Sequence, residues 1–310
     1  MSIAFVFPGQ GAQTIGMGQA LADAYPAARA VFDEVDDALG EKLSEVIWND
    51  DIETLTLTQN AQPALMATSM AAMAALKAEG LGIERASFVA GHSLGEYAAL
   101  CAAGAVSLAD TARLLRIRGR AMQAAVPVGQ GAMAAVLGLD AAAAEKVAEA
   151  AAQGDVCQLA NENDPSQNVL SGSKAAIERA VVLAKEAGAK RALPLPVSAP
   201  FHCALMQPAA DAMAQALSEV TMNDPSVPLV ANVLAEAVTS ADQIRDLLVQ
   251  QVTGRVRWRS SVEWMVEQGV TEFWEIGAGK ALSGMIRRIA KDSTLRAVGT
   301  PDDVAAVKAG

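Results

Sequence analysis

The sequence predicts an α/β fold in which a small domain with ferredoxin-like strand order is inserted into a larger domain built on a parallel sheet. Two observations support this prediction. Short apolar runs alternate with long alanine-rich helical patterns, as is typical of a parallel sheet covered by helices. In the middle of the chain the order changes to strand, helix, two strands, helix and strand.

The larger domain is expected to begin with a strand at Ile3–Phe7, which a glycine-rich turn, PGQG, follows. Its next elements are expected to be a helix at Gln19–Leu39 with Pro26 as a candidate break, a helix at Pro63–Lys77, a short strand at Ser87–Ala90, and helices at Leu94–Gly104 and Leu108–Met122. After the insertion we expect a helix at Asp242–Val252, a helix from Ser260, a strand at Glu272–Ile276 and a last helix from Leu282.

The inserted domain lies between turn-rich segments. PVGQG at Pro127–Gly131 precedes it, and a proline-rich stretch ends it. Its elements are expected to be strands at Ala132–Leu139, Val156–Asn161, Asn168–Ser171 and Arg191–Val197, with helices at Asp140–Gln153 and Lys174–Ala187. We therefore expect residues 127–198 to form the small domain, and residues 1–126 and 199–310 to form the large one.

Composition and charge restrict the class of protein. Of 310 residues, 52% are hydrophobic and 19% are charged, so the chain can bury a large core and is not expected to be disordered. A formal charge of −11 gives no basic field to attract nucleic acid, and an anionic ligand would need a local basic pocket. No basic residue precedes Arg29 and no alanine-rich stretch reaches the length of a membrane span, so we expect a cytoplasmic protein.

The cysteines and histidines do not form a metal-binding pattern. Cys101, Cys157 and Cys203 lack the spacing of metal ligands and are expected to be reduced thiols. The two histidines, His92 and His202, are too few for a histidine-rich site. We therefore expect no metal ion.

The strongest chemical motif is GHSLG at Gly91–Gly95, a G-x-S-x-G pattern. A β-like run precedes Ser93 and a helical pattern follows it, which is the strand–turn–helix order of a nucleophile elbow. Such a turn exposes the serine Oγ, and the helix after it directs free N–H groups toward a developing oxyanion. The alternative is that Ser93 only caps the helix.

A serine hydroxyl needs a base to act as a nucleophile. His92 is adjacent to Ser93, so in a sharp turn the two side chains are expected to diverge, which leaves His92 as a wall or supporting residue. His202 lies in the loop SAPFHC, just after the inserted domain, where a cleft between domains is expected. We favour His202 as the base over a structural histidine.

Arg118 falls on the apolar face of the helix expected at Leu108–Met122, whereas Arg113, Arg116 and Arg120 share the opposite face as a solvated surface or docking patch. A buried arginine keeps its charge and therefore requires an anionic partner. That partner is either a carboxylate of the protein or a carboxylate of the substrate, which the planar guanidinium would hold with two parallel hydrogen bonds.

Two glycine-rich segments carry weaker signals. FPGQGAQ at Phe7–Gln13 lacks the third glycine of a dinucleotide fingerprint, and it is either a second source of an oxyanion N–H or an ordinary turn. GAGK at Gly277–Lys280 fails as a phosphate-binding loop, because Trp274 stands at the first glycine position and Ala281 replaces the required Ser or Thr.

The set of motifs resembles that of the malonyl-CoA:acyl-carrier-protein transacylases of fatty-acid synthesis. The resemblance covers essentially the whole chain and rests on segments that recur in the family's order and spacing. These are FPGQGAQ, TQNAQPA at Thr58–Ala64, GHSLGEYAAL, RGRAMQ, GAMAAVLG, SAPFH and the segment Gln251–Trp258. The resemblance implies a hydrolase-like α/β core with a ferredoxin-like insert, and a monomer.

The family pattern implies the catalytic roles. It makes Ser93 the acylated nucleophile and His202 its base. A backbone carbonyl, here that of Gln251, orients the histidine in place of an aspartate. The oxyanion donors would be the backbone N–H groups of Gln10 and Leu94.

The same resemblance implies the substrate-binding residues. Arg118 would hold the free carboxylate of the malonyl group. Phenylalanine before the base histidine accompanies malonyl rather than methylmalonyl in related polyketide acyltransferases. The segment after Gln251 departs from the family's usual Asn and Pro, so Gln250 is an alternative orienting residue. The other residues expected near the cleft are His92, Asn161 and Phe201.

The implied reaction is a ping-pong transfer of malonyl from malonyl-CoA to the phosphopantetheine thiol of acyl carrier protein, through a malonyl-serine ester and without a cofactor. Its partners would be malonyl-CoA and an acidic carrier protein, with neither nucleic acid nor a membrane. Candidate basic rims for the carrier are Lys185, Lys190 and Arg191, or Arg287, Arg288 and Lys291. The alternatives are a free-standing acyltransferase of a polyketide synthase, a serine thioesterase with water as acceptor, and a silent interaction domain.

Overall fold

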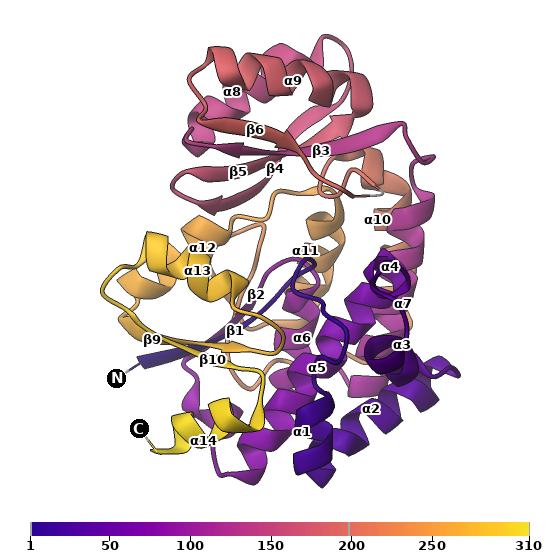
Figure 1. The fold of residues 1–310 in the computed structure, drawn as a ribbon, viewed down its shortest axis with the longest axis vertical. Coiled ribbons are helices and arrows are strands. Elements are labelled where there is room, and N and C mark those ends of the chain that lie inside the picture. Colours follow the sequence, from indigo (N-terminus) through magenta and orange to yellow (C-terminus); the bar gives the residue numbers. More distant parts are fainter. Residues whose placement is uncertain (1, 198, 310) are drawn as a thin grey trace.

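The computed structural model describes residues 2–197 and 199–309, and its two sheets lie one above the other in Figure 1. The predicted mixed α/β fold with a parallel sheet is confirmed. The larger sheet has the order β10-β9-β1-β2-β7-β8 and is parallel except where β8 pairs with β7. Its strands are β1 (Ser2–Phe7), β2 (Phe88–Gly91), β7 (Leu229–Val230), β8 (Ala237–Val238), β9 (Val270–Ile276) and β10 (Thr294–Val298).

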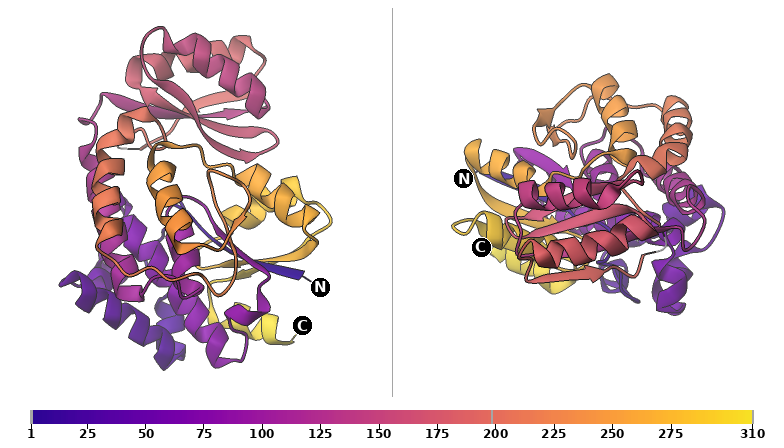
Figure 2. Two further views of the ribbon diagram at one scale, coloured as in Figure 1. Left: turned by 180° about the vertical axis from the view of Figure 1, so that it is seen from behind. Right: turned by 90° about the horizontal axis from the view of Figure 1, so that it is seen from above.

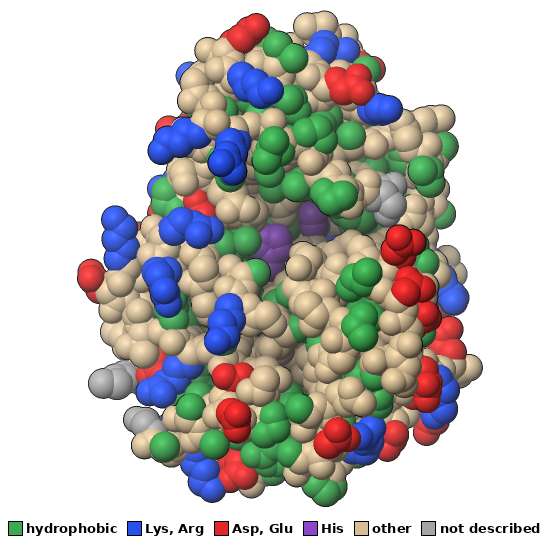
Figure 3. Space-filling view, in the orientation of Figure 1, with side chains coloured by type: hydrophobic (Ala, Val, Ile, Leu, Met, Phe, Trp, Pro, Cys, Tyr) green, Lys and Arg blue, Asp and Glu red, His purple; other side chains and the backbone are tan. Residues whose placement is uncertain are grey.

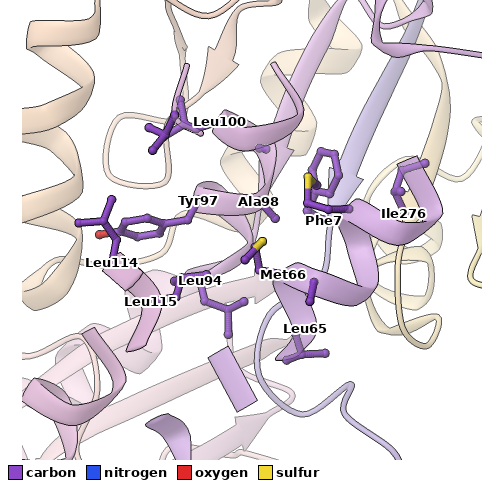
Figure 4. Packing of buried hydrophobic residues seen from close by; sticks show 14 of the residues in the cluster. Phe7, Leu65, Met66, Leu94, Tyr97, Ala98, Leu100, Leu114, Leu115 and Ile276 are labelled. Carbon is purple, nitrogen blue, oxygen red and sulfur yellow. The ribbon is translucent and has the colours of Figure 1, made fainter. Parts of the chain in front are cut away.

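Helices cover both faces of this sheet (Figures 1 and 2). Alternate residues of β1 enter two different cores, as the two-residue period of a strand requires. Phe5 and Phe7 pack into the larger core, part of which Figure 4 shows, whereas Ala4 and Val6 pack on the opposite face. A strand that is buried on both faces is apolar throughout, which explains the run IAFVF.

The helices of this part of the chain follow in sequence order. They are α1 (Gln19–Ala24), α2 (Pro26–Leu39), α3 (Leu43–Asn49), α4 (Ile52–Thr56), α5 (Thr58–Ala78), α6 (Gly95–Ala102), α7 (Leu108–Ala124), α10 (Gln207–Ser218), α11 (Ala241–Thr253), α12 (Trp258–Glu267), α13 (Ala281–Ile289) and α14 (Pro301–Ala309), with short 3₁₀ helices at Ile83–Arg85 and Ala204–Met206. In the residues that the structure describes, no helix has the length and apolar character needed to cross a membrane.

The smaller sheet is antiparallel, with the order β4-β5-β3-β6. Its elements are β3 (Gly131–Leu137), α8 (Ala141–Ala152), β4 (Cys157–Asp164), β5 (Gln167–Ser173), α9 (Lys174–Glu186) and β6 (Arg191–Pro194). Its helices and strands enclose a separate core, and β4 meets the larger part of the molecule, where Asn161 forms a backbone bridge with Val256. The expected boundary at Ser198 lies outside the described residues.

Helix α5 begins at Thr58, earlier than the predicted start at Pro63. The prediction placed proline in the first turn of the helix, where it is favoured because it has no N–H to donate. In the structure Pro63 lies inside the helix, so the carbonyl of Gln59 receives no N–H from it. Nη1 of Arg116 donates to that carbonyl at 2.7 Å instead, which compensates for the missing backbone bond.

The sequence predicts that the helix beginning near Leu282 is the last element of the fold, and this is wrong, because a strand and a helix follow it. Strand β10 pairs in parallel with β9, and α14 follows it. Strand β10 is an edge strand and most of its residues are partly exposed, so its sequence, TLRAV, lacks the apolar run of a central strand. Helices α3, α4 and α10 and the short strands β7 and β8 were also missed.

Candidate active site

Ser93 stands on the turn between β2 and α6 and has a left-handed backbone, with φ of 55°. A Cβ on Gly95 would lie 2.2 Å from the carbonyl oxygen of Phe7, so only glycine allows the turn to pack this closely on β1. The N-cap position of α6 belongs to Leu94, and no side chain caps the helix. The structure therefore has the elbow geometry and not the alternative of a capping serine.

His202 meets this serine from the loop after the smaller sheet. Its Nε2 lies 2.7 Å from Ser93 Oγ, and its Nδ1 lies 2.8 Å from the backbone oxygen of Gln251. The carbonyl of Gln250, the alternative orienting residue, accepts from the N–H of Gly254 at 2.8 Å instead. Burial, together with the nearby charge of Arg118, lowers the pKa of His202 to about 3, so the imidazole is neutral at pH 7 and able to accept a proton.

Arg118, on α7, is 1% exposed and points into the same site. Its Nη1 donates to Gln62 Oε1 at 2.7 Å, and its Nη2 donates to Gln251 Oε1 at 2.8 Å and to Ser93 Oγ at 3.1 Å. Within the described chain it forms no ion pair with a carboxylate, and its buried Nε has no hydrogen-bond partner. The guanidinium is thus oriented by neutral groups and retains the capacity to bind an anion.

The side chain of Gln251 connects these groups. While its Oε1 accepts from Arg118, its Nε2 donates to the backbone oxygen of Ser93 at 2.9 Å and also to the carboxyl group of Glu96. Because its backbone carbonyl faces His202, one residue contacts the nucleophile, the candidate base and the arginine. It is completely buried, so these contacts have a fixed geometry.

Two backbone N–H groups were predicted to form an oxyanion hole. Leu94 is at the start of α6, and Gln10 lies in the loop after β1, where its side chain accepts from Thr58 at 3.1 Å. Neither amide N–H donates to another atom in the part of the chain that the structure describes. The loop packs against the elbow, since a Cβ on Gly9 would lie 2.6 Å from the backbone oxygen of His92.

The other residues predicted to lie near the cleft are His92, Phe201 and Asn161, and their contacts differ. Nε2 of His92 is 2.9 Å from Asn163 Oδ1, and desolvation lowers the pKa of its imidazole. His92 makes no hydrogen bond to Ser93 among the described atoms, in agreement with the expected divergence of the two side chains. Phe201 belongs to the larger core. Asn161 is buried on β4. The residue of β4 that contacts His92 is Asn163 and not Asn161.

A hollow with histidine atoms at its base separates the upper and lower parts of the molecule in Figure 3. A cavity of about 330 Å³ opens beside His202 and is lined by residues of α8, β4 and the segment 253–255 at and after the end of α11, among them Gln158 and Arg255. An ion pair between Arg255 and Glu145 joins the two parts of the molecule at its wall. In the described residues no cluster of three or more His, Cys, Asp or Glu is placed to hold a metal ion.

Several polar residues of the site were not predicted. Gln62 and Glu96 lie inside motifs that the sequence offered, TQNAQPA and GHSLGE, so the signal was present but only the serine was singled out. Asn232 lies in a segment without a motif; its Oδ1 accepts from the Ser93 N–H at 2.8 Å and its Nδ2 donates to Gly91. Only the tertiary structure brings it to the elbow.

Comparison with known proteins finds relatives that match almost the whole chain. The model of a family described as "Acyl transferase domain" matches residues 4–301. A malonyl CoA-acyl carrier protein transacylase of Escherichia coli strain K12 is 48% identical over 303 residues, which are 98% of this chain and 97% of the relative.

Solved structures extend the similarity to three dimensions. An acyl-carrier-protein S-malonyltransferase from Bartonella henselae has a TM-score of 0.97 and 56% identity, over 99% of this chain and 98% of that one. A malonyl-transacylase solved in complex with a type II PKS acyl-carrier protein has a TM-score of 0.96 and 42% identity, over 100% of this chain and 99% of that one.

Proposed function

Because the chain belongs to the acyl transferase family, we propose that it transfers malonyl from malonyl-CoA to the phosphopantetheine thiol of acyl carrier protein, a step that supplies fatty-acid synthesis. The observation that carries this proposal is the meeting of three groups. Ser93 Oγ lies 2.7 Å from His202 Nε2 and 3.1 Å from Arg118 Nη2, so a nucleophile, a neutral base and an anion-binding cation share one site.

In the first half-reaction, Ser93 gives its proton to His202 as its Oγ attacks the thioester carbonyl of malonyl-CoA. The backbone N–H groups of Gln10 and Leu94 are the proposed donors to the oxyanion. Losing one such donor typically raises a barrier by about 2.7–4 kcal/mol. The carbon–sulfur bond then breaks, the imidazolium returns the proton to the CoA sulfur, and a malonyl-serine ester remains.

In the second half-reaction, the phosphopantetheine thiol gives its proton to His202 and its sulfur attacks the serine ester. The same N–H groups stabilise the second oxyanion. The serine–acyl bond breaks, Ser93 recovers its proton from the imidazolium, and malonyl-carrier protein leaves. The steps use side chains and backbone groups of this chain together with the substrates, and we propose that neither a metal ion nor a redox cofactor takes part.

Arg118 is the proposed partner of the malonyl carboxylate. Gln62 and Gln251 hold the guanidinium in place without neutralising it. An acyl group without a carboxylate leaves that buried cation unpaired, which disfavours it by about 1–3 kcal/mol. Phe201 is proposed to favour malonyl over the bulkier methylmalonyl group.

The proposed organisation places this site between two domains, residues 127–198 and residues 1–126 with 199–310. We propose a monomer of the cytoplasm, in keeping with the free thiols of Cys101, Cys157 and Cys203.

Basic side chains gather on one side of the molecule in Figure 3, and an acidic carrier is proposed to dock there. Arg288 is already bonded to Asp164, so Arg287 and Lys291 are the more available residues of that cluster.

Charge reversal tests the docking proposal. Arg287→Glu with Lys291→Glu is expected to raise the KM for carrier protein, while the rate of loading from malonyl-CoA stays unchanged. Lys185→Glu with Lys190→Glu tests the cluster on the smaller sheet in the same way. An unchanged KM in both double variants would remove the idea of basic docking rims.

A second candidate function comes from the relative solved with a type II PKS acyl-carrier protein, whose partner serves a polyketide synthase. Carrier proteins of the two pathways, presented at equal concentration to the loaded enzyme, would identify the preferred acceptor. Release of free malonate without any carrier would instead indicate the thioesterase alternative.

Intact mass spectrometry tests the proposed function directly. Incubation with malonyl-CoA is expected to add one malonyl group to the protein, and Ser93→Ala is expected to abolish the addition. Acetyl-CoA and methylmalonyl-CoA are expected to load more slowly. If malonyl-CoA leaves the protein mass unchanged, the proposed function is wrong.

A further inference from the structure

Glu96, on the first turn of α6, is a buried carboxyl group that the proposed mechanism does not use. It is 1% exposed. Its Oε1 accepts from the backbone N–H of Asn232 at 3.3 Å, and its Oε2 accepts from Nε2 of Gln251. The charged and titratable groups that face it are Arg118 of α7 and Tyr97 of its own helix. Burial of a carboxyl group is costly, so these contacts call for an explanation.

The side-chain amide of Gln251 has an oxygen end and an NH₂ end, and both ends form hydrogen bonds in the site. The oxygen end accepts from Arg118, and the NH₂ end donates to Ser93 O and to Glu96. If the amide turned over, its NH₂ group would face the guanidinium, and neither group could accept a hydrogen bond from the other. An ionised carboxylate only accepts, so it stabilises the NH₂ end where it is.

We propose that Glu96 is a positioning residue for malonyl selectivity, which fixes the amide of Gln251 and thereby holds the Arg118 guanidinium where the malonyl carboxylate reaches it. This inference rests on the proposed function. Glu96 does not act on the base through this amide, because His202 bonds to the backbone carbonyl of Gln251, and the contact of the amide with Ser93 is to the backbone oxygen and not to Oγ.

The charge on Glu96 depends on pH near neutrality. Burial raises the pKa of Glu96 to about 7, against the lowering effect of Gln251, the Asn232 N–H and Arg118. The carboxyl group is therefore ionised above that pH, where it accepts from the NH₂ end of Gln251, and it is protonated below it. The malonyl-to-acetyl ratio is expected to fall as the pH drops below 7.

The test compares Glu96→Gln with Glu275→Gln. Glu275 is a matched control, since it is also 1% exposed and accepts two backbone N–H bonds, from Leu282 at 2.9 Å and from Ser283 at 2.7 Å, but it lies on β9 and its acceptor atoms face the first turn of α13. Loading rates with malonyl-CoA and acetyl-CoA are measured by intact mass. We expect Glu96→Gln to lower the malonyl-to-acetyl ratio about tenfold, the effect of weakening one hydrogen bond to a charged group, and Glu275→Gln to leave it unchanged.

A second background shows whether the effect passes through the arginine. In Arg118→Ala, the further change Glu96→Gln is expected to alter the ratio by less than about twofold, because the two sites are coupled. An unchanged ratio in Glu96→Gln, or an equal fall in both backgrounds, would overturn the inference. Wild-type loading from malonyl-CoA, scored separately, decides the proposed function.

A measurement on the wild type covers the case in which Glu96→Gln does not fold. The loading rates with malonyl-CoA and acetyl-CoA are measured between about pH 6 and 8.5, and the malonyl-to-acetyl ratio is expected to fall as the pH drops through about 7. A ratio that does not change over this range would also overturn the inference, because it would show that the charge on Glu96 does not act on the arginine.

Discussion

Helix α7 carries two buried arginines, and the regions around them differ. Arg116 donates to the carbonyl of Gln59 at 2.7 Å and to the side chain of Asn60, and it forms an ion pair with Glu41. Burial lowers the pKa of its guanidinium, and Glu41 opposes that shift. This cation has a carboxylate partner of its own and connects α7 to the segments that cover it.

Arg118 lies on the other face of the helix, and no carboxylate among the described residues forms an ion pair with it. Its acceptors are the amide oxygens of Gln62 and Gln251 and the hydroxyl of Ser93. These neutral acceptors orient the cation without pairing with its charge, and Glu96 acts on it only across Gln251, so a bound carboxylate would give it a direct anionic partner. The comparison teaches that a buried arginine held by amides indicates a ligand site, whereas one held by a carboxylate indicates structural support.

Substitution of Arg118 is expected to have the largest effect. Arg118→Ala removes the proposed carboxylate partner, and loading from malonyl-CoA should fall by about 100-fold or more, the loss expected for a buried charge-assisted pair. Acetyl loading should persist or rise, since the buried cation no longer opposes it. The measurement is single-turnover intact mass, and equal loss of both acyl groups would contradict the assigned role.

Substitution of Arg116 should give the opposite result. Arg116→Met keeps apolar packing but removes the bonds to Gln59 and Glu41, so the free energy of unfolding should fall by about 1–3 kcal/mol. Denaturant unfolding measures this change. The malonyl-to-acetyl ratio should remain that of the wild type, and a changed ratio would show that the two arginine regions are not independent.

The pH dependence of Ser93 reactivity tests whether burial and the nearby Arg118 lower the pKa of His202. An ordinary histidine with a pKa near 6.5 would lose about tenfold of its neutral form between pH 7.5 and 5.5. The lowered pKa of His202, about 3, keeps it neutral over that range, so the base is lost only as the pH falls toward that value. Labelling of Ser93 by a neutral sulfonyl fluoride should therefore change less than about twofold. A break near pH 6.5 would show that burial and Arg118 do not control the base.

Substitution of the exposed carboxylate should have the smallest effect. The side chain of Glu41 is 44% exposed, so water and salt screen its pair with Arg116. Glu41→Gln should lower the free energy of unfolding by less than about 1 kcal/mol, and less still at high salt. A loss as large as that of Arg116→Met would mean that the carboxylate, and not the Gln59 carbonyl, provides most of the stabilisation.

The sequence predicted those parts of the site that depend on local patterns. The elbow at Ser93 follows from a strand, a glycine-flanked serine and a helix, and the burial of Arg118 follows from its place on the helical wheel. The same wheel placed Arg116 on a solvated face, and this was wrong, because that residue is 6% exposed. A wheel describes one helix and contains no information on the segments that cover it.

Contacts between distant segments could not be predicted in this way. Asn232 and Ser93 are 139 positions apart and meet only after β7 has paired with β2. Asn163 reaches His92 because β4 packs against the larger part of the molecule. Such contacts arise from the packing of two sheets, and no single window of the sequence contains both partners.

The backbone carbonyl that orients His202 determines how readily the histidine gives up a proton. An uncharged amide oxygen stabilises an imidazolium less than a carboxylate would, so the proton is held briefly and weakly. A thiolate leaves with little protonation, because a thiol is acidic, whereas the serine oxygen leaves only with a proton. A weakly held proton passes easily to that oxygen, so a site of this kind suits exchange between sulfur and oxygen esters.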